Sequence, residues 1–223
     1  MNLPIATQVT LPNLRWLGFM GSSTYIEVIL TRITTPVLAK LQIGFFHQLT
    51  FPVPHLSQFM GSTGSPKFSS INLEFSEKNS TLQVYPHKGA DMSTYTMRLR
   101  VDSCRLDRQV ASAVQILNTL WTALSTMDHF TLEHDEKLHK NAQRTHWCEL
   151  LRSLGNLKTL QVPNSLVGEL SCCLQSEDME PPMDLLPELK VLEYTATDGV
   201  SDAFASFIDV RKNAGHPVAL LHR

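Results

Sequence analysis

The hydrophobic residues of this chain recur in one short pattern: two apolar residues separated by two positions, then a third two residues later. Leu14, Leu17 and Phe19 form the first copy. The copies start at Leu14, Leu38, Phe68, Thr94, Met127, Leu157 and Leu189, and a shorter copy starts at Val218. Neighbouring copies start about 24 to 33 residues apart, a period typical of proteins built from repeated units. Alternation at the last two apolar positions predicts a short strand with one buried face.

The segments between these strands carry apolar residues at helical spacing. In residues 145–154, Trp147, Leu150 and Leu151 share one face, and Gly155 follows as a stop signal. The same reasoning predicts helices in residues 24–33, 54–60, 107–127, 164–174 and 201–213. Leu82 and Val84 indicate an additional strand. The polar residues 133–144 and the acidic, proline-containing residues 175–187 are expected to form loops.

A strand followed by a returning helix cannot bury its own apolar face, so repeated units must stack on one another. The sequence therefore predicts an α/β fold: a curved solenoid with a parallel sheet on its concave side and helices on its convex side. No linker divides the chain, so we expect a single domain over residues 1–223.

Composition narrows the possible partners and compartments. The formal net charge is −2, so no overall field attracts the chain to nucleic acid or to acidic membranes. There is no signal-peptide pattern and no apolar run of membrane-spanning length. The four cysteines match no disulfide framework, and free thiols favour a reducing compartment. We therefore expect an intracellular protein, cytoplasmic or nuclear, with no nucleic-acid or membrane partner.

Three stretches carry a resemblance to known proteins: residues 11–17, 154–160 and 186–192 resemble the strand entries of leucine-rich repeats. From Leu11 to its end, the chain is similar to the irregular leucine-rich-repeat region of the F-box-like proteins of mushroom-forming fungi, most of all in residues 202–218. The resemblance implies an irregular leucine-rich-repeat solenoid. In that family an F-box before the repeats docks a Skp-type adaptor. Only about ten residues precede the first repeat here, so we expect a C-terminal fragment of a longer F-box-like architecture, and adaptor binding only where an F-box precedes it.

The chain contains residue types that can bind metals or act as nucleophiles, but their spacing matches no known metal or catalytic motif. His134, His139, His146 and Cys148 form the one cluster of metal-ligand types, and their spacings match no zinc site. Cys172 and Cys173 are expected in a helix as small apolar residues rather than a redox pair. No nucleophile signature or phosphate-binding loop occurs. We therefore predict no catalytic residue, cofactor or metal, and no enzyme; a metal-dependent enzyme using the histidines and cysteine after Glu133 is the least favoured alternative.

The strand positions between the apolar ones face the concave side and are the candidate partner-binding residues. They are Trp16, Lys40, Gln42, Asn72, Glu74, Arg98, Arg100, His129, Thr131, Glu133, Thr159, Gln161 and Glu193. Arg98 and Arg100 form a basic spot within this mixed face. Such a sheet suits protein recognition. The leading hypothesis is a protein–protein interaction module resembling the substrate-recognition part of an F-box ubiquitin-ligase subunit; the alternative is a stand-alone scaffold with no ligase attached.

Overall fold

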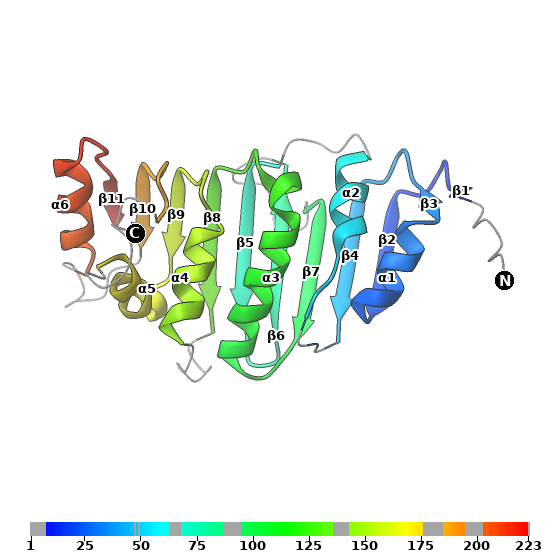
Figure 1. Cartoon of the computed structure of the whole chain (residues 1–223), viewed down its shortest axis with the longest axis horizontal. Coiled ribbons are helices and arrows are strands. Elements are labelled where there is room, and N and C mark those ends of the chain that lie inside the picture. The colour runs from blue at the N-terminus through cyan, green and yellow to red at the C-terminus, as the bar shows by residue number, and fades with distance from the viewer. Residues whose placement is uncertain are drawn as a thin grey trace.

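One long, mostly parallel sheet runs through the molecule, with helices packed against one of its faces (Figure 1). The computed structural model describes residues 8–46, 48, 50–62, 68–86, 95–135, 143–175, 185–194 and 203–222. A small two-stranded parallel sheet of β1 (Val9–Thr10) and β3 (Ile33–Thr34) lies at the N-terminal end. The α/β class predicted from the sequence is confirmed.

The main sheet has nine strands in the order β11-β10-β9-β8-β5-β6-β7-β4-β2. Their bounds are β2 (Trp16–Gly21), β4 (Lys40–Phe45), β5 (Ser70–Phe75), β6 (Asn79–Tyr85), β7 (Met97–Asp102), β8 (His129–His134), β9 (Thr159–Val162), β10 (Val191–Tyr194) and β11 (Ala219–His222). All neighbouring pairs are parallel except the two that involve β6, which is antiparallel to both β5 and β7. Each of the eight repeated patterns supplies a strand, and the additional strand around Leu82 is β6.

The strand order departs from the chain order in the middle of the sheet. We expected each unit to lie beside its neighbour in the chain, but β4 pairs with β7, and β5 pairs with β8. The cause is a tight turn in which Ser76 N–H donates to the carbonyl oxygen of Asn79 (2.9 Å) and folds β6 back onto β5. The free edge of β6 then receives β7, which fills the space between β6 and β4.

Helices occupy the six segments in which the apolar spacing predicted them. They are α1 (Ser23–Leu30), α2 (Pro54–Ser62), α3 (Leu106–Leu124), α4 (Arg144–Arg152), α5 (Val167–Leu174) and α6 (Ala205–Asn213), and the short 3-10 helix η2 (Asn164–Leu166) leads into α5. In Figure 1, α1 to α5 lie in front of the strands, and α6 lies beside β11 at the C-terminal end. In the described part of the chain, no helix is both long and apolar enough to cross a membrane.

The core lies between the sheet and the helices. Alternate strand residues such as Ile43, Phe75 and Leu160 point into it and are fully buried. Trp147 of α4 is also fully buried, and its ring meets Phe75 edge-on with centroids 5.5 Å apart. Burial of large aromatic side chains supplies much of the favourable free energy of folding. The polar strand residues point to the other face of the sheet, which is the place to look for function.

Candidate functional site

The face of the sheet turned away from the helices carries the predicted partner-binding residues. We call it the open face. It presents Trp16 from β2, Lys40 and Gln42 from β4, Arg98 and Arg100 from β7, Asn72 and Glu74 from β5, His129, Thr131 and Glu133 from β8, Thr159 and Gln161 from β9, and Glu193 from β10. Alternation along each strand places these residues opposite the core positions, as the sequence predicted.

Strand pairing arranges these side chains in rows that run across the sheet. Paired residues continue one row from Gln42 through Arg98, Gln83, Asn72, Thr131 and Gln161 to Glu193. A second row runs from Gly44 through Arg100, Thr81 and Glu74 to Glu133. Residues paired across neighbouring strands lie close enough to interact. The rows bring together residues from parts of the chain that no local sequence pattern connects.

The predicted residues differ widely in accessibility. Asn72 and His129 are each only 8% exposed, and Glu193 is 4% exposed. The side chains in this region also bond to one another: the Asn72 amide donates to Glu133 Oε1 (3.0 Å). Thr131 Oγ1 lies 3.5 Å from Gln161 Oε1 in the neighbouring strand. The central and C-terminal parts of the open face are therefore largely occupied by contacts within the chain.

The N-terminal end of the open face is much more accessible. Trp16 is 56% exposed and Met20 is 66% exposed; Trp16 pairs with Lys40 of β4, and Arg98 and Arg100 lie on β7, the next strand beyond β4. We call these five residues the basic-aromatic end. Tryptophan and arginine are the residue types that most often dominate binding energies at protein interfaces.

A glycine lets the Trp16 indole lie flat on the sheet, and Met20 packs against a second glycine. A Cβ atom at Gly18 would lie 2.5 Å from Cη2 of Trp16, so the indole occupies the space above that glycine. A Cβ atom at Gly44 would lie 3.5 Å from Cε of Met20. Because Gly18 carries no side chain, Trp16 covers the start of the Gln42 row, and Met20 lies against the start of the Arg100 row.

The cations of this end are held in different ways. Lys40 Nζ lies 5.1 Å above the ring centroid of Tyr95, whose hydroxyl donates to Gln42 Oε1 (3.2 Å). Arg100 Nε lies 2.8 Å from Asp102 Oδ1, and both side chains are about half exposed, so this pair adds little stability. Arg98 has no ion-pair or hydrogen-bond partner among the residues that the structure describes. Its half-buried guanidinium is not engaged by those residues and can therefore bind a carboxylate of a partner.

Met20 and Tyr95 belong to this surface although the sequence reasoning did not include them. The alternation that selected Trp16 continues through Gly18 to Met20, so the signal for Met20 was present and stopped one step early. Tyr95 precedes β7 and gives no strand signal of its own. Only the three-dimensional structure places its ring under Lys40.

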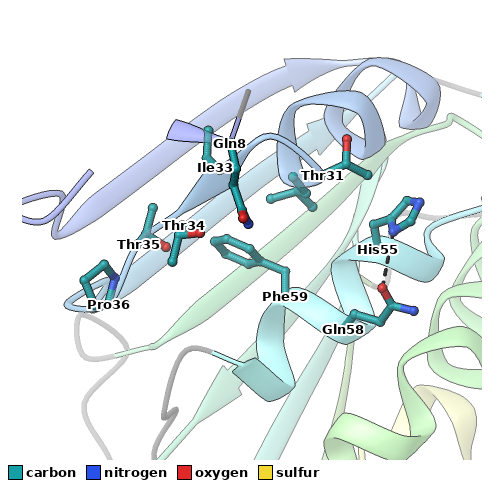
Figure 2. A pocket seen from close by; sticks show the side chains of 10 residues that line it. Gln8, Thr31, Ile33, Thr34, Thr35, Pro36, His55, Gln58 and Phe59 are labelled. Atoms are coloured by element: carbon teal, nitrogen blue, oxygen red, sulfur yellow. Dashed lines mark hydrogen bonds between the residues drawn. The ribbon is translucent and has the colours of Figure 1, made fainter. Parts of the chain in front are cut away.

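A cavity of about 640 Å³ lies away from the open face, between α2 and the segment that joins α1 to β4. Its lining includes the hydroxyls of Thr31 and Thr34 and the ring of Phe59. Figure 2 shows Phe59 between Thr34 and the pair of His55 and Gln58, whose Nδ1 and Oε1 atoms are 3.3 Å apart. None of the predicted site residues lines this cavity.

The residues with metal-ligand chemistry are dispersed. Within the described ranges, no three His, Cys, Asp or Glu side chains gather closely enough to hold a metal ion. His134 Nδ1 lies 3.1 Å from the Ser165 hydroxyl, and His139 lies outside the described residues. Both cysteines lie in α5; Cys173 is buried, as expected for a small apolar residue, whereas Cys172 is exposed and not buried or half-buried as expected. Burial, together with the neighbouring Cys148, raises the pKa of the Cys173 thiol, which opposes use of this sulfur as a nucleophile.

Comparison of the chain with models of known protein families, with curated proteins and with solved structures finds no match.

Proposed function

We propose that this chain is a non-enzymatic protein-recognition module that binds its partner through the basic-aromatic end of the open face. The exposure of Trp16 and Met20 beside three cations supports the proposal most strongly. An exposed tryptophan on a regular strand offers a large contact area and loses little conformational entropy on binding. Arg98 and Arg100 would add charge-assisted hydrogen bonds to carboxylates of the partner.

The finer proposal is that the strand–helix units form an irregular leucine-rich-repeat solenoid that acts as the substrate-recognition part of a ubiquitin-ligase subunit. Support comes from the repeated strand entries and from the resemblance to F-box-like proteins. In this role the module would hold a protein while an attached ligase delivers ubiquitin. A Skp-type adaptor would bind only a protein in which an F-box accompanies the repeats.

Charge reversal on the two faces of the molecule tests the proposed surface. Arg98→Glu with Arg100→Glu reverses two charges on the open face. Arg108→Glu with Arg152→Glu makes the same change in net charge on exposed positions of α3 and α4. Each protein is immobilised and exposed to an extract of the source cells, and retained proteins are quantified by mass spectrometry. Circular dichroism checks that all three chains are folded.

We expect at least one protein to be retained equally by the wild type and by Arg108→Glu with Arg152→Glu. The amount of this protein retained by Arg98→Glu with Arg100→Glu should be at least about tenfold lower. Proteins retained equally by all three chains would contradict binding through this face. An in-frame F-box upstream in the transcript, with adaptor binding by the longer product, would support the ligase role. Failure of such a longer product to bind the adaptor would exclude that role and leave a scaffold.

A further inference from the structure

Apolar, basic and acidic groups follow one another across the open face at nearly equal steps. Trp16 lies on β2, the two arginines lie on β7, and Glu74 lies on β5. One strand, β4, separates β2 from β7, and one strand, β6, separates β7 from β5. Neighbouring strands are about 4.8 Å apart, so each step spans about 9.6 Å.

The row structure aligns the three groups. Trp16 lies over Gly18, which pairs with Gln42 at the start of the row that contains Arg98. Met20 lies against Gly44 at the start of the row that contains Arg100 and Glu74. Along the row of Arg100, a partner segment that crosses the strands at right angles therefore meets Met20, then a guanidinium, then the Glu74 carboxylate. The row of Arg98 meets Asn72 on β5.

The acidic group is reinforced by a second carboxylate. Glu74 is paired with Glu133 of β8, and both side chains are half-buried. Like charges placed opposite one another across strands repel each other, which favours binding of a cation between them. Glu133 also accepts the Asn72 amide hydrogen bond, which fixes its position. The open face thus carries Lys40 on β4, Arg98 and the Arg100–Asp102 pair on β7, and the two glutamates on β5 and β8, so its charge changes from net basic to acidic between β7 and β5.

Building on the proposed function, we infer that the partner presents a polyproline II segment with an apolar residue, an acidic residue three positions on, and a basic residue three positions further. A polyproline II helix has three residues per turn and rises about 3.1 Å per residue, so every third side chain lies on one side at a spacing of about 9.3 Å. This spacing matches two strand separations of about 9.6 Å. A β-strand would place residues three apart on opposite sides.

Single-stranded nucleic acid also binds surfaces that combine aromatic and basic side chains. The order of charges on the open face favours the peptide over nucleic acid. A nucleic-acid backbone carries a negative charge at every nucleotide. A strand that passed over Arg98 and Arg100 would continue over Glu74 and Glu133 and be repelled there. A peptide can reverse its charge at that point.

Two capped peptides of identical composition test the inference against the full chain. The first contains, in order, leucine, two prolines, aspartate, two prolines and lysine. In the second, aspartate and lysine exchange places. The leucine marks one end, so the charge order is defined whichever direction the peptide runs. Binding is measured by isothermal titration calorimetry at low and high salt, and a uridine oligonucleotide is titrated in parallel.

We expect the first peptide to bind at least about tenfold more tightly than the second, and more weakly at high salt. Arg98→Glu with Arg100→Glu should abolish the preference, because carboxylates then lie under both charged positions of either peptide, whereas Arg108→Glu with Arg152→Glu should leave it unchanged. Equal binding of the two peptides, or no binding of either, would overturn the inference. Tighter binding of the oligonucleotide than of the first peptide would also overturn it. If the extract experiment finds a partner dependent on Arg98 and Arg100 while the peptides are not distinguished, only the charge order fails.

Discussion

The two ends of the sheet use similar sequence patterns and reach different degrees of burial. Around α4 and β9, Trp147, Leu154 and Leu160 are fully buried. Around β2, the equivalent core residues Leu17 and Phe19 are only half-buried. Among the residues that the structure describes, eight of the ten exposed large hydrophobic residues lie between Val9 and Phe46. The same apolar spacing therefore does not guarantee the same burial.

The difference follows from neighbours. β9 is flanked by β8 and β10, and α4 packs between α3 and α5. β2 is an edge strand of the main sheet, so its unit packs against a neighbouring unit on one side only. In a stacked array, burial depends on the units on either side as much as on the unit itself. Apolar surface left at an end is then available to a partner.

Two tryptophans give the largest expected contrast between the ends. Trp147→Ala should lower the free energy of unfolding by about 3 to 5 kcal/mol, because it removes a fully buried side chain that packs on Phe75. Trp16→Ala should change it by no more than about 0.5 kcal/mol, because that side chain is 56% exposed. Urea denaturation followed by circular dichroism measures both. Similar losses for the two variants would contradict the contrast.

The C-terminal edge provides the next test, because there a buried cation closes the end of the sheet. Arg211 of α6 is 1% exposed, and its Nη2 donates to the carbonyl oxygens of Pro187 (2.9 Å) and Leu189 (3.3 Å). Arg211→Ala leaves these two acceptors without their donor and opens a cavity. We therefore expect the free energy of unfolding to fall by about 2 to 4 kcal/mol.

The matched control is Lys212→Ala, which changes the neighbouring exposed residue and should be nearly neutral. Hydrogen exchange should show faster amide exchange in α6 of Arg211→Ala than in the wild type. An unchanged exchange rate in α6 would mean that Arg211 does not hold this helix in place.

The sequence predicted the secondary structure of each segment, but it could not predict which segments lie beside one another in the sheet. The helical spacing of Trp147, Leu150 and Leu151 located α4, and alternation located the strands and the face to which their polar residues point. The pairing of β4 with β7 depends on a turn of a few residues that returns β6 along β5. An alternating pattern records a buried face but does not identify the strand beside it.

The same limit applies to the candidate site. Alternation assigned both Arg98 and His129 to the open face, but the structure leaves Arg98 partly exposed and His129 only 8% exposed. That difference depends on neighbours in space. The flat placement of Trp16 over Gly18 could be suspected from a glycine two residues along the strand, but only the structure shows it.

At the N-terminal end, a polar contact compensates for limited apolar burial. The Glu27 carboxylate of α1 accepts the backbone N–H groups of His55 (2.7 Å) and Leu56 (3.0 Å) at the start of α2. It therefore satisfies two amides that the helix itself leaves free. Glu27→Gln retains the size of the side chain but removes its charge. We expect this change to lower the free energy of unfolding by about 1 kcal/mol.

Glu149→Gln on the exposed face of α4 is the control and should change stability by no more than about 0.5 kcal/mol. The urea midpoints of the two variants and the wild type show whether the Glu27 charge stabilises the fold. If Glu27→Gln is as stable as the control, the contact between α1 and α2 does not depend on this charge.

The smallest expected effect concerns the thiols and appears only in alkaline solution. At neutral pH, iodoacetamide should modify the exposed Cys104 and Cys172 and leave Cys148 and Cys173 unmodified until the chain unfolds. Folding raises the pKa of Cys173 above its ordinary value of 9.0, mainly through burial and next through Cys148. The stability linked to this thiol is therefore fully present below pH 9.0 and is lost as the pH rises, because the unfolded chain releases the proton more readily.

Cys173→Ala should therefore show a smaller decrease in its urea midpoint between pH 8 and pH 10 than the wild type does, whereas Cys172→Ala should follow the wild type. The comparison with Cys172→Ala removes the effects of lysine and tyrosine titration, which all three proteins share. Identical pH dependence in the three proteins would mean that the α4–α5 contact does not hold this thiol in its neutral form. Rapid labelling of Cys148 in the folded chain would show that the C-terminal core opens as readily as the N-terminal end, and the contrast between the two ends would then fail.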